Sequence, residues 1–367
     1  MQEQLLMIPG PCALDPEVLK EMSRPLIPHY GEDWAKVYNS VRDDLKPLLG
    51  TKQDVFMNVG SGHSAVETAI NGLAGAGEKI LVVENGIFGY KIAWIARNLG
   101  IEPVVVQEDW GKSADPARIE ATLQEHREVV AVAMVHGETS TGIVNPVAEV
   151  GQIAQKHGLP FFVDAVCSVG AMEFEMDKWG VDVVVTASQK GLSAPPGLAI
   201  LCLSEKGWAR VRRETHRPVG WYLNLNIWRE YSDSQRDYQP YGITMTVNNV
   251  RALKVSLQQI YQEGMEKRFA RHREVMAYLK DGLESLGLEP WATGEPLPLV
   301  TAVKCPAGIA TKQIVDSLIK DYGIWIGSGL GEYKQTVFRI GHMGASAKKE
   351  AIDRLILALQ GTLKKLR

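Results

Sequence analysis

The sequence has little of what marks several large classes of proteins. Its 367 residues include only four cysteines, none of them in a CxxC pair, so it indicates neither a disulfide framework nor a metal site such as zinc. It has no run of 18 or more apolar residues and no signal-peptide pattern at its N-terminus, so we expect a cytoplasmic protein without a membrane partner. The net charge is -3 and no basic run with interleaved aromatics occurs, so we expect no nucleic-acid partner. The cysteines are Cys12, Cys167, Cys202 and Cys305.

The composition is that of an ordinary globular enzyme, with 45% hydrophobic and 23% charged residues. A chain of this length can bury a large core and usually divides into two domains. Neither an internal repeat nor a low-complexity linker is present, which indicates closely packed domains. We therefore expect the partners of this chain to be small molecules.

The first two thirds of the chain alternate between short apolar runs and amphipathic segments. This alternation is typical of βαβ units around a mostly parallel sheet, so we predict an α/β fold. The predicted strands are 55–59, 79–83, 103–107, 129–135, 160–164, 181–186 and 198–203. The predicted helices between them, with apolar residues three and four positions apart, are 64–74, 90–98, 116–125 and 147–157.

A different pattern begins near Asn248. Two long and highly charged helical segments lead into a region with an α+β layout. The helical segments are 250–264 and 265–287, and the later elements are strands at 299–304 and 337–340 and helices at 311–322 and 348–365. We therefore predict an N-terminal arm (1–15), a large domain (16–260) and a small C-terminal domain (261–367).

An acid and a lysine follow two of the predicted strands. Asp164 ends the run FFVD, and Lys190 lies between a β-branched run and a loop rich in glycine and proline. A lysine at the end of a buried sheet has a lowered pKa because of desolvation. Pyridoxal phosphate chemistry needs this pair, since the lysine forms an imine with the cofactor aldehyde and the acid keeps the pyridine nitrogen protonated. Taken singly, each residue could also be a surface charge or a loop cap.

Two polar loops follow other predicted strands. The small residues of the segment 60–63, GSGH, let backbone N–H groups approach an anion, so it is a candidate phosphate cradle. A tight turn with a serine helix cap fits that segment equally well. It is neither a Walker loop nor GxGxxG, which disfavours a dinucleotide. The segment 136–142, HGETSTG, could hydrogen-bond a cofactor or a substrate, or be a polar turn.

Seven short motifs occur in the order found in one family. They are PGP near the N-terminus, GSGH, NGIFG, HGETSTG, VDAVCSVG, SQKGLSAPPG and FRIG. In this combination the chain closely resembles the class V aminotransferases, in particular the alanine–glyoxylate or serine–pyruvate aminotransferase group, over essentially its whole length. The resemblance implies pyridoxal 5'-phosphate as cofactor and the type I fold of the enzymes that use it. That fold has a mostly parallel seven-stranded sheet flanked by helices and a smaller α+β C-terminal domain.

The resemblance also implies roles for individual residues. Lys190 would be the catalytic Schiff-base lysine and proton shuttle, and Asp164 would be the catalytic partner of the pyridinium nitrogen. Val166 and Phe88 would pack on opposite faces of the cofactor ring, with Phe88 where relatives often have tryptophan. The other cofactor contacts would come from Ser61, Gly62, His63, Thr139 and Gln189.

Substrate and subunit contacts follow from the same resemblance. Arg339 would bind the substrate α-carboxylate, a role that suits a planar guanidinium at a strand end, although a salt bridge is the alternative. Pro9 and Gly10 would line the mouth of the pocket. Tyr241 and Thr244 resemble a pair that reaches the cofactor phosphate from the neighbouring subunit. The resemblance therefore predicts a homodimer with shared active sites.

The activity implied by the resemblance is a ping-pong transamination. An amino group would pass from a small amino acid, alanine or serine, to a small 2-oxo acid, glyoxylate or pyruvate. The segment 241–245 departs from relatives, which often have histidines and a proline there, so the donor stays open. Relatives with the same frame act on ureidoglycine, 2-aminoethylphosphonate or pyridoxamine. A cysteine desulfurase is disfavoured, because the loop 327–331 has no cysteine and Gln189 stands where desulfurases usually have histidine.

Overall fold

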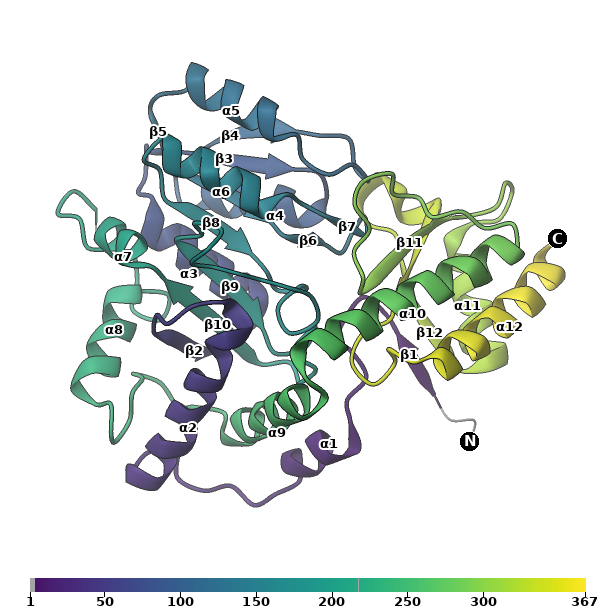
Figure 1. Cartoon of the computed structure of the whole chain (residues 1–367), viewed down its shortest axis with the longest axis horizontal. Coiled ribbons are helices and arrows are strands. Elements are labelled where there is room, and N and C mark those ends of the chain that lie inside the picture. The colour runs from purple at the N-terminus through teal and green to yellow at the C-terminus, as the bar shows by residue number, and fades with distance from the viewer. Residues whose placement is uncertain (1–3, 217) are drawn as a thin grey trace.

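The computed structural model describes residues 4–216 and 218–367. Two sheets, each with its own hydrophobic core, form two lobes that lie side by side (Figure 1). The strands of the larger sheet are β2 (Val55–Val59), β3 (Lys79–Glu84), β4 (Glu102–Gln107), β5 (Val129–Val135), β8 (Phe161–Asp164), β9 (Val183–Ala187) and β10 (Leu198–Leu203). Their order across the sheet is β2-β10-β9-β8-β5-β3-β4.

Strand β10 runs antiparallel to both of its neighbours, and the other neighbouring pairs in this sheet are parallel. Both β9 and β10 are buried along their whole length, as expected for apolar strands covered on two faces. The predicted α/β fold with a mostly parallel seven-stranded sheet is therefore confirmed.

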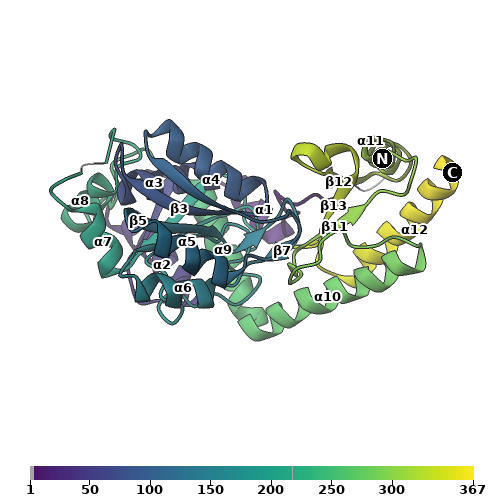
Figure 2. The ribbon, with the colours of Figure 1, turned by 90° about the horizontal axis from the view of Figure 1, so that it is seen from above.

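Helices cover both faces of the larger sheet (Figure 2). One face carries α3 (Gly62–Leu73), α4 (Ile87–Asn98), α7 (Glu205–Val211) and α8 (Leu225–Ser234). The opposite face carries α2 (Glu32–Leu45), α5 (Pro116–Glu125), α6 (Val147–Lys156) and α9 (Val247–Glu263). The smaller elements are α1 (Pro16–Met22), a hairpin of β6 (Gly137–Glu138) and β7 (Ile143–Val144), and two 3-10 turns, Pro47–Leu49 and Gly331–Gln335.

The smaller sheet has four strands in the order β1-β12-β13-β11. These are β1 (Leu5–Met7), β11 (Val300–Lys304), β12 (Ile324–Ser328) and β13 (Val337–Gly341). A second core forms between this sheet and α10 (Met265–Ser285), α11 (Thr311–Tyr322) and α12 (Lys349–Leu366). Because β1 pairs with β12, the N-terminal segment crosses to the lobe that is built mainly from the C-terminal third.

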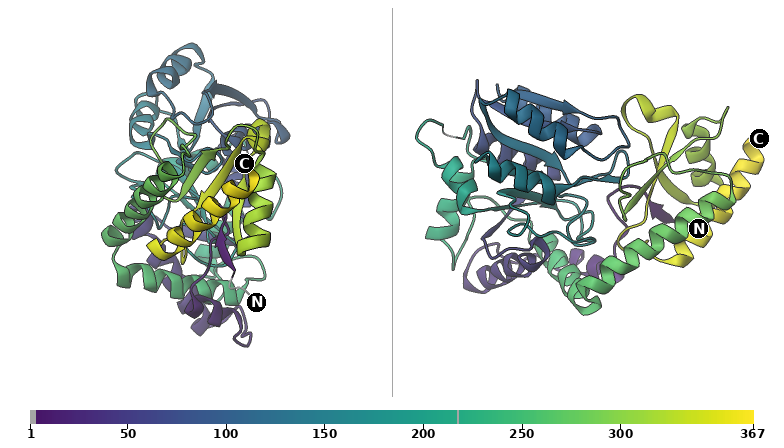
Figure 3. Two further views of the ribbon diagram at one scale, coloured as in Figure 1. Left: turned by 90° about the vertical axis from the view of Figure 1, so that its right-hand side faces the viewer. Right: turned by 45° about the horizontal axis from the view of Figure 1, so that its top comes forward.

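The two long helices α9 and α10 connect the lobes. They meet at Gly264, whose φ of +85° lies in the region that favours glycine. Figure 3 shows α10 running from the larger lobe along the smaller one. The predicted domain boundaries at residues 15 and 260 stay predictions. Among the residues that the structure describes, no helix has both the length and the apolar character that a bilayer span requires.

Candidate active site

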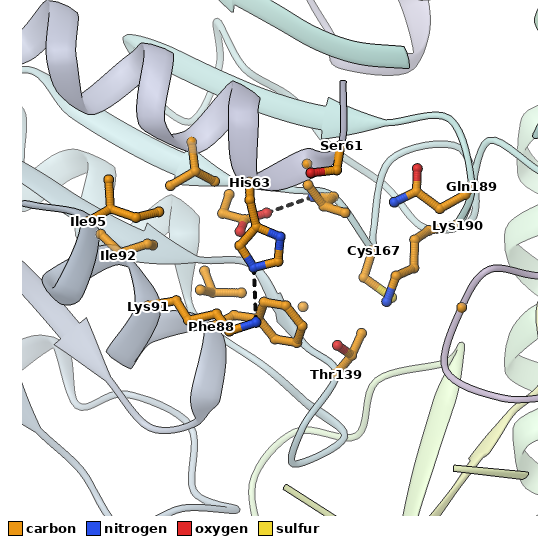
Figure 4. Close-up of a pocket in the computed structure, with 17 residues that line it drawn as sticks. Ser61, His63, Phe88, Lys91, Ile92, Ile95, Thr139, Cys167, Gln189 and Lys190 are labelled. Atoms are coloured by element: carbon orange, nitrogen blue, oxygen red, sulfur yellow. Dashed lines mark hydrogen bonds between the residues drawn. The ribbon is translucent and has the colours of Figure 1, made fainter. Parts of the chain in front are cut away.

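The polar residues that follow β2, β5, β8 and β9 lie around one cavity of about 210 Å³ (Figure 4). This is the edge where parallel strands end, the usual place for the site of an α/β enzyme. A second cavity of about 450 Å³ opens between the lobes. Four residues line both cavities, namely Gly10, Phe88, Thr139 and Lys190. The two cavities therefore meet at the lysine.

Asp164, at the end of β8, lies in the floor of the first cavity and is 6% exposed. Its Oδ1 accepts a hydrogen bond from the Val166 N–H at 3.0 Å. Burial raises the pKa of this carboxyl from 3.8 to about 6, the Glu138 carboxylate adds to the rise, and Lys190 opposes it. A cationic ring nitrogen placed in the cavity would stabilise the ionised carboxylate, which otherwise has little compensation for its burial.

Lys190 lies in the tight loop between β9 and β10, and its Nζ donates a hydrogen bond to the Pro9 carbonyl at 2.5 Å. Burial lowers the pKa of the ammonium group. The Arg339 cation lowers it further, and the anionic forms of Asp164 and other acidic neighbours oppose the shift. A lysine with a lowered pKa is more often neutral and nucleophilic, as an attack on an aldehyde requires.

The candidate phosphate cradle, residues 60–63, leads into the first turn of α3. Ser61 is the N-cap and its side chain makes no capping hydrogen bond, while Gly62 and His63 begin the helix. N–H groups in the first turn have no partner within a helix, and the positive end of the helix dipole favours an anion there. A Cβ on Gly62 would lie 2.8 Å from Val166 Cγ2, so only glycine lets the helix start this close to the loop after β8.

The residues around this cavity fit pyridoxal phosphate. Gln189 contributes a side-chain amide whose buried Oε1 has no hydrogen-bond partner in the part of the chain that the structure describes. If the amide is rotated by about 180° around its last bond, its NH₂ group takes the position of Oε1 and can donate a hydrogen bond there. The α3 cradle would hold the phosphate, Asp164 the ring nitrogen, and Lys190 the aldehyde carbon.

Phe88 and Val166 both line the first cavity, as the resemblance implies for residues that pack against a ring. Phe88 is placed by Glu138, a fully buried carboxylate that the sequence analysis did not single out. Glu138 Oε2 accepts from the N–H groups of Phe88 and Gly89 at 3.0 and 3.2 Å, and Oε1 accepts from Ser140. Glu138, from strand β6, thus places a carboxylate at the N-terminus of α4, where the helix dipole favours a negative charge.

A second residue that the sequence analysis missed is Lys91, on α4. Its Nζ lies 3.0 Å from His63 Nε2 and 5.1 Å from the centre of the Phe88 ring, and it lines the first cavity (Figure 4). Burial and two lysines, Lys91 and Lys190, lower the pKa of His63. The only sequence signal for Lys91 is its spacing of three from Phe88, which places both on one helix face.

Arg339, on β13 of the small lobe, faces the second cavity and is 8% exposed. Its Nε donates to the Ser328 carbonyl at 2.8 Å and its Nη1 to the Thr139 carbonyl at 3.1 Å. No group among the described residues accepts from Nη2, so the outer edge of the guanidinium stays available for a bidentate carboxylate. Burial lowers the pKa of Arg339 to about 10, so the group remains charged at neutral pH.

The remaining predicted site residues divide into two groups. Pro9 and Gly10 line the second cavity beside Lys190. Tyr241 and Thr244 line neither of these two cavities. The Tyr241 hydroxyl is bonded within the same chain to the Trp34 indole and the His29 carbonyl, and Thr244 is exposed. The structure therefore brings the predicted residues together except for the pair assigned to the neighbouring subunit.

Comparison with known proteins gives a consistent result. The aminotransferase class-V family model matches residues 19–355. An uncharacterized aminotransferase from Methanocaldococcus jannaschii is 35% identical over 96% of this chain and 91% of its own length. The alanine–glyoxylate aminotransferase of Oryctolagus cuniculus is 32% identical over 98% of this chain and 92% of its own. The L-aspartate–glyoxylate aminotransferase of Paracoccus denitrificans is 32% identical, with 96% and 89% covered.

Solved structures agree with the family model. An alanine–glyoxylate aminotransferase from Nostoc sp. has a TM-score of 0.94 at 30% identity, covering 99% of this chain and 96% of its own. A ureidoglycine–glyoxylate aminotransferase from Bacillus subtilis gives 0.93 at 29%, with 100% and 94% covered. A pyridoxamine–pyruvate aminotransferase from Mesorhizobium loti gives 0.92 at 26%, with 100% and 93% covered. The chain therefore belongs to the class V aminotransferases and is a transaminase that depends on pyridoxal 5'-phosphate.

Proposed function

We propose that this enzyme transfers the amino group of a small amino acid, alanine or serine, to a small 2-oxo acid, glyoxylate or pyruvate. One observation carries the proposal. Lys190 lies where the cavity that contains Asp164 meets the cavity that contains Arg339. A group able to move a proton thus stands between a cofactor site and a carboxylate site, as a ping-pong exchange requires.

The bound cofactor supplies an aldehyde and an electron-accepting ring, and the chain supplies the rest. Asp164 would hold the ring nitrogen in its cationic form, because an ionised carboxylate next to that nitrogen favours its protonation. Lys190 Nζ would take the α-proton of the substrate and later return a proton. Its lowered pKa keeps a fraction of the amine neutral for this step.

Arg339 would orient the substrate. A carboxylate bound by the free edge of the guanidinium has a fixed direction, so the α-carbon is held toward Lys190 Nζ. Nε and Nη1 are already anchored to two carbonyls, which fixes the plane of the guanidinium before the substrate arrives. The guanidinium is therefore oriented before the substrate binds, so little side-chain entropy is lost on binding.

The wall of the second cavity supports a monocarboxylic donor. The small lobe contributes several apolar side chains to the lining, namely Val315, Ile319, Trp325 and Leu330. Among the described residues that line this cavity, the cations are Lys190 and Arg339. A second carboxylate would meet no cation of its own, which argues against aspartate as the donor. 2-Aminoethylphosphonate has a single acidic group, which could pair with Arg339, so it stays an alternative. Ureidoglycine and pyridoxamine remain alternatives within the same family.

Desulfuration of cysteine is the weaker alternative. Cys167 is the one thiol lining either cavity in the described part of the chain, and it is 3% exposed. Burial raises its pKa to about 12, so it stays protonated and is a poor nucleophile.

We also propose a homodimer with shared sites. The large lobe exposes Val219, Trp221, Tyr222 and Tyr238, which are 70%, 49%, 40% and 52% accessible. These side chains flank the segment that carries Tyr241 and Thr244. Exposed aromatic residues are enriched at interfaces between subunits.

Absorbance spectroscopy tests the proposed activity. The purified protein, supplied with pyridoxal phosphate, is titrated with alanine, serine, ureidoglycine and pyridoxamine, and then with glyoxylate, with Lys190→Ala beside it. We expect the visible band of the lysine-bound cofactor to disappear with alanine or serine and to return with glyoxylate. A band that responds only to ureidoglycine or pyridoxamine would transfer the assignment to that amine.

A further inference from the structure

Arg268, near the start of α10, is a charged residue with only 5% of its surface exposed. Its Nε donates to the Gly170 carbonyl at 2.5 Å, and its Nη2 donates to the Gly191 carbonyl at 3.0 Å and to Ser193 Oγ at 2.8 Å. Gly170 belongs to the loop that follows Asp164, and Gly191 directly follows Lys190. One guanidinium therefore joins the loop after the acid to the loop that carries the lysine.

The two loops touch through their backbones. A Cβ on Gly191 would lie 2.3 Å from the Val169 carbonyl oxygen, and a Cβ on Gly170 would lie 3.0 Å from the Gly191 oxygen. Ser193 has a φ of +55°, a left-handed conformation that is unusual for a residue other than glycine. Contacts from outside must hold such a conformation in place. Arg268 supplies a hydrogen bond to the Ser193 side chain at this point.

On its other side Arg268 is tied to the small lobe. Its Nη1 pairs with Glu263 Oε2 at 3.1 Å, and the same oxygen accepts from Arg271 Nη2 at 2.9 Å. Arg271 Nη1 donates to the Ala347 carbonyl, just before α12, at 2.8 Å. This network crosses the junction of α9 and α10 at Gly264. It connects the small lobe to the loop of Lys190 through hydrogen bonds and ion pairs.

We propose that Arg268 is a positioning residue for Lys190, fixing the lysine loop against the loop after Asp164 and linking both to the small lobe. Arg268 lines neither of the two cavities, so it acts through the loop and not by contact with substrate. The inference rests on the proposed role of Lys190. A lysine cannot replace the arginine, since a compact ammonium does not reach three acceptors in the plane of the guanidinium fork.

Loosening this loop has a predictable effect on Lys190. Lys190 is partly buried, and this burial is the largest cause of the lowered pKa of its amine. If the loop moves toward the open cavity between the lobes, the amine regains water and its pKa rises. The other charged or titratable groups that act on it from neighbouring elements are Cys12, His63, Glu138, Asp164, Cys167 and Arg339.

Competitive labelling of the full-length, cofactor-free protein tests the proposal. The rate at which acetic anhydride modifies Lys190 is measured as a function of pH by peptide mass spectrometry. The midpoint of the profile reports the pKa of the amine and the plateau reports its accessibility. In Arg268→Met we expect the midpoint to move up and the labelling rate near neutral pH to fall several-fold relative to the plateau. In Arg268→Lys we expect a smaller upward shift.

Arg42→Met is the matched control. Arg42 is also 5% exposed and donates from Nε to the Val55 carbonyl, but it lies on α2 away from the lysine loop. It should lower the melting temperature as Arg268→Met does without moving the Lys190 midpoint. If Arg268→Met does not fold, Ser193→Gly removes one contact and relieves the backbone, and should shift the midpoint in the same direction. An unchanged midpoint in Arg268→Met, or in Ser193→Gly where that variant replaces it, would overturn the proposal.

The labelling experiment and the spectroscopic test of transamination can give opposite results, so the failure of one proposal can be told from the failure of the other. The labelling profile needs neither cofactor nor substrate, so it holds even if the amino donor is another amine. Where the proposed transamination is also correct, Arg268→Met should lower kcat for alanine more than it raises KM, because the carboxylate site at Arg339 is untouched.

Discussion

The backbone of Gly10 lies against the side chain of Lys190. A Cβ added at Gly10 would be 2.6 Å from Lys190 Cε and 2.7 Å from Cδ, closer than any real contact of this kind. The N-terminal segment and the lysine loop therefore fit together only because residue 10 has no side chain. Gly10→Ala should push the lysine out of place and lower kcat about 100-fold, the usual cost of displacing a reacting group by about 1 Å.

Gly31→Ala separates this effect from backbone strain. Gly31 has a φ of +98°, close to the +115° of Gly10, and a Cβ there would meet nothing within 4 Å. Both substitutions should cost about 1–3 kcal/mol of stability, measured by chemical denaturation. Borohydride trapping followed by mass spectrometry gives the fraction of Lys190 that carries cofactor. Equal trapping in the two variants would contradict the steric explanation.

The ionised Asp164 carboxylate should lower the free energy of unfolding of the cofactor-free chain, relative to a chain with a neutral side chain at this position. Burial raises its pKa from 3.8 to about 6, so the folded chain binds a proton more readily than the unfolded chain in that window. The free energy of unfolding therefore falls as pH rises through the window, and above it the ionised carboxylate costs up to about 3 kcal/mol. Asp164→Asn should raise the melting temperature of the cofactor-free protein at neutral pH.

The same substitution should weaken cofactor binding, because the ring nitrogen loses its anionic partner. Thermal melts over a range of pH, with and without pyridoxal phosphate, measure both effects. The stability difference between variant and wild type should vanish at a pH below 3.8, where the carboxylate is protonated in both states. A variant that is no more stable than wild type at neutral pH, with the cofactor absent, would refute this account.

Local sequence patterns were sufficient where local chemistry decides the structure. The strands predicted at 55–59, 129–135 and 198–203 and the helices at 116–125 and 311–322 have the predicted bounds in the structure. Proline near the start and an aspartate cap define α5 within its own segment. Such elements need no information from distant residues.

Elements that depend on distant residues were predicted less well. Helix α4 begins at Ile87 and not at 90, because Glu138 accepts hydrogen bonds from its first turn across the fold. The strands β1 and β12 were not predicted from the sequence. The three-residue β1 pairs with β12, and β12 pairs also with β13, so both depend on residues from other segments. Lys91 and Arg268 were missed for the same reason, because their partners come from other elements.

Arg339→Met should reduce recognition of the substrate carboxylate while leaving the cofactor site intact. Loss of a buried, bidentate charged contact costs about 2–5 kcal/mol, and even the lower bound is more than a 10-fold change. We expect kcat/KM for alanine to fall at least about 30-fold. Arg339→Lys keeps the charge but not the fork, so it should recover only part of the loss.

The control for Arg339 is an amine that has no carboxylate. Ethylamine presents the same amino group without the group that Arg339 binds, so its slow reaction with the bound cofactor should be nearly the same in both proteins. The dissociation constant for pyridoxal phosphate should also be unchanged. A parallel loss for alanine and ethylamine would mean that Arg339 supports the fold of the site and does not bind the substrate.

Hybrid dimers test whether the active site is shared. If Tyr241 and Thr244 complete the site of the neighbouring subunit, then Lys190→Ala and the double variant Tyr241→Phe/Thr244→Val carry defects in opposite halves of each site. A hybrid of the two has one site with all defects and one intact site. Random reassortment makes half of the dimers hybrids, so a mixture of two inactive proteins should recover about a quarter of wild-type activity.

The Tyr241 hydroxyl is hydrogen-bonded to Trp34 and His29 of its own chain. For Tyr241 to reach a partner's phosphate, those bonds must exchange for new ones when the dimer forms. If Tyr241 keeps these bonds instead, Tyr241→Phe alone should leave the dissociation constant for pyridoxal phosphate unchanged, and any weaker binding in the double variant comes from Thr244. A mixture that stays inactive, with hybrids verified by native mass spectrometry, would show that each chain completes its own site.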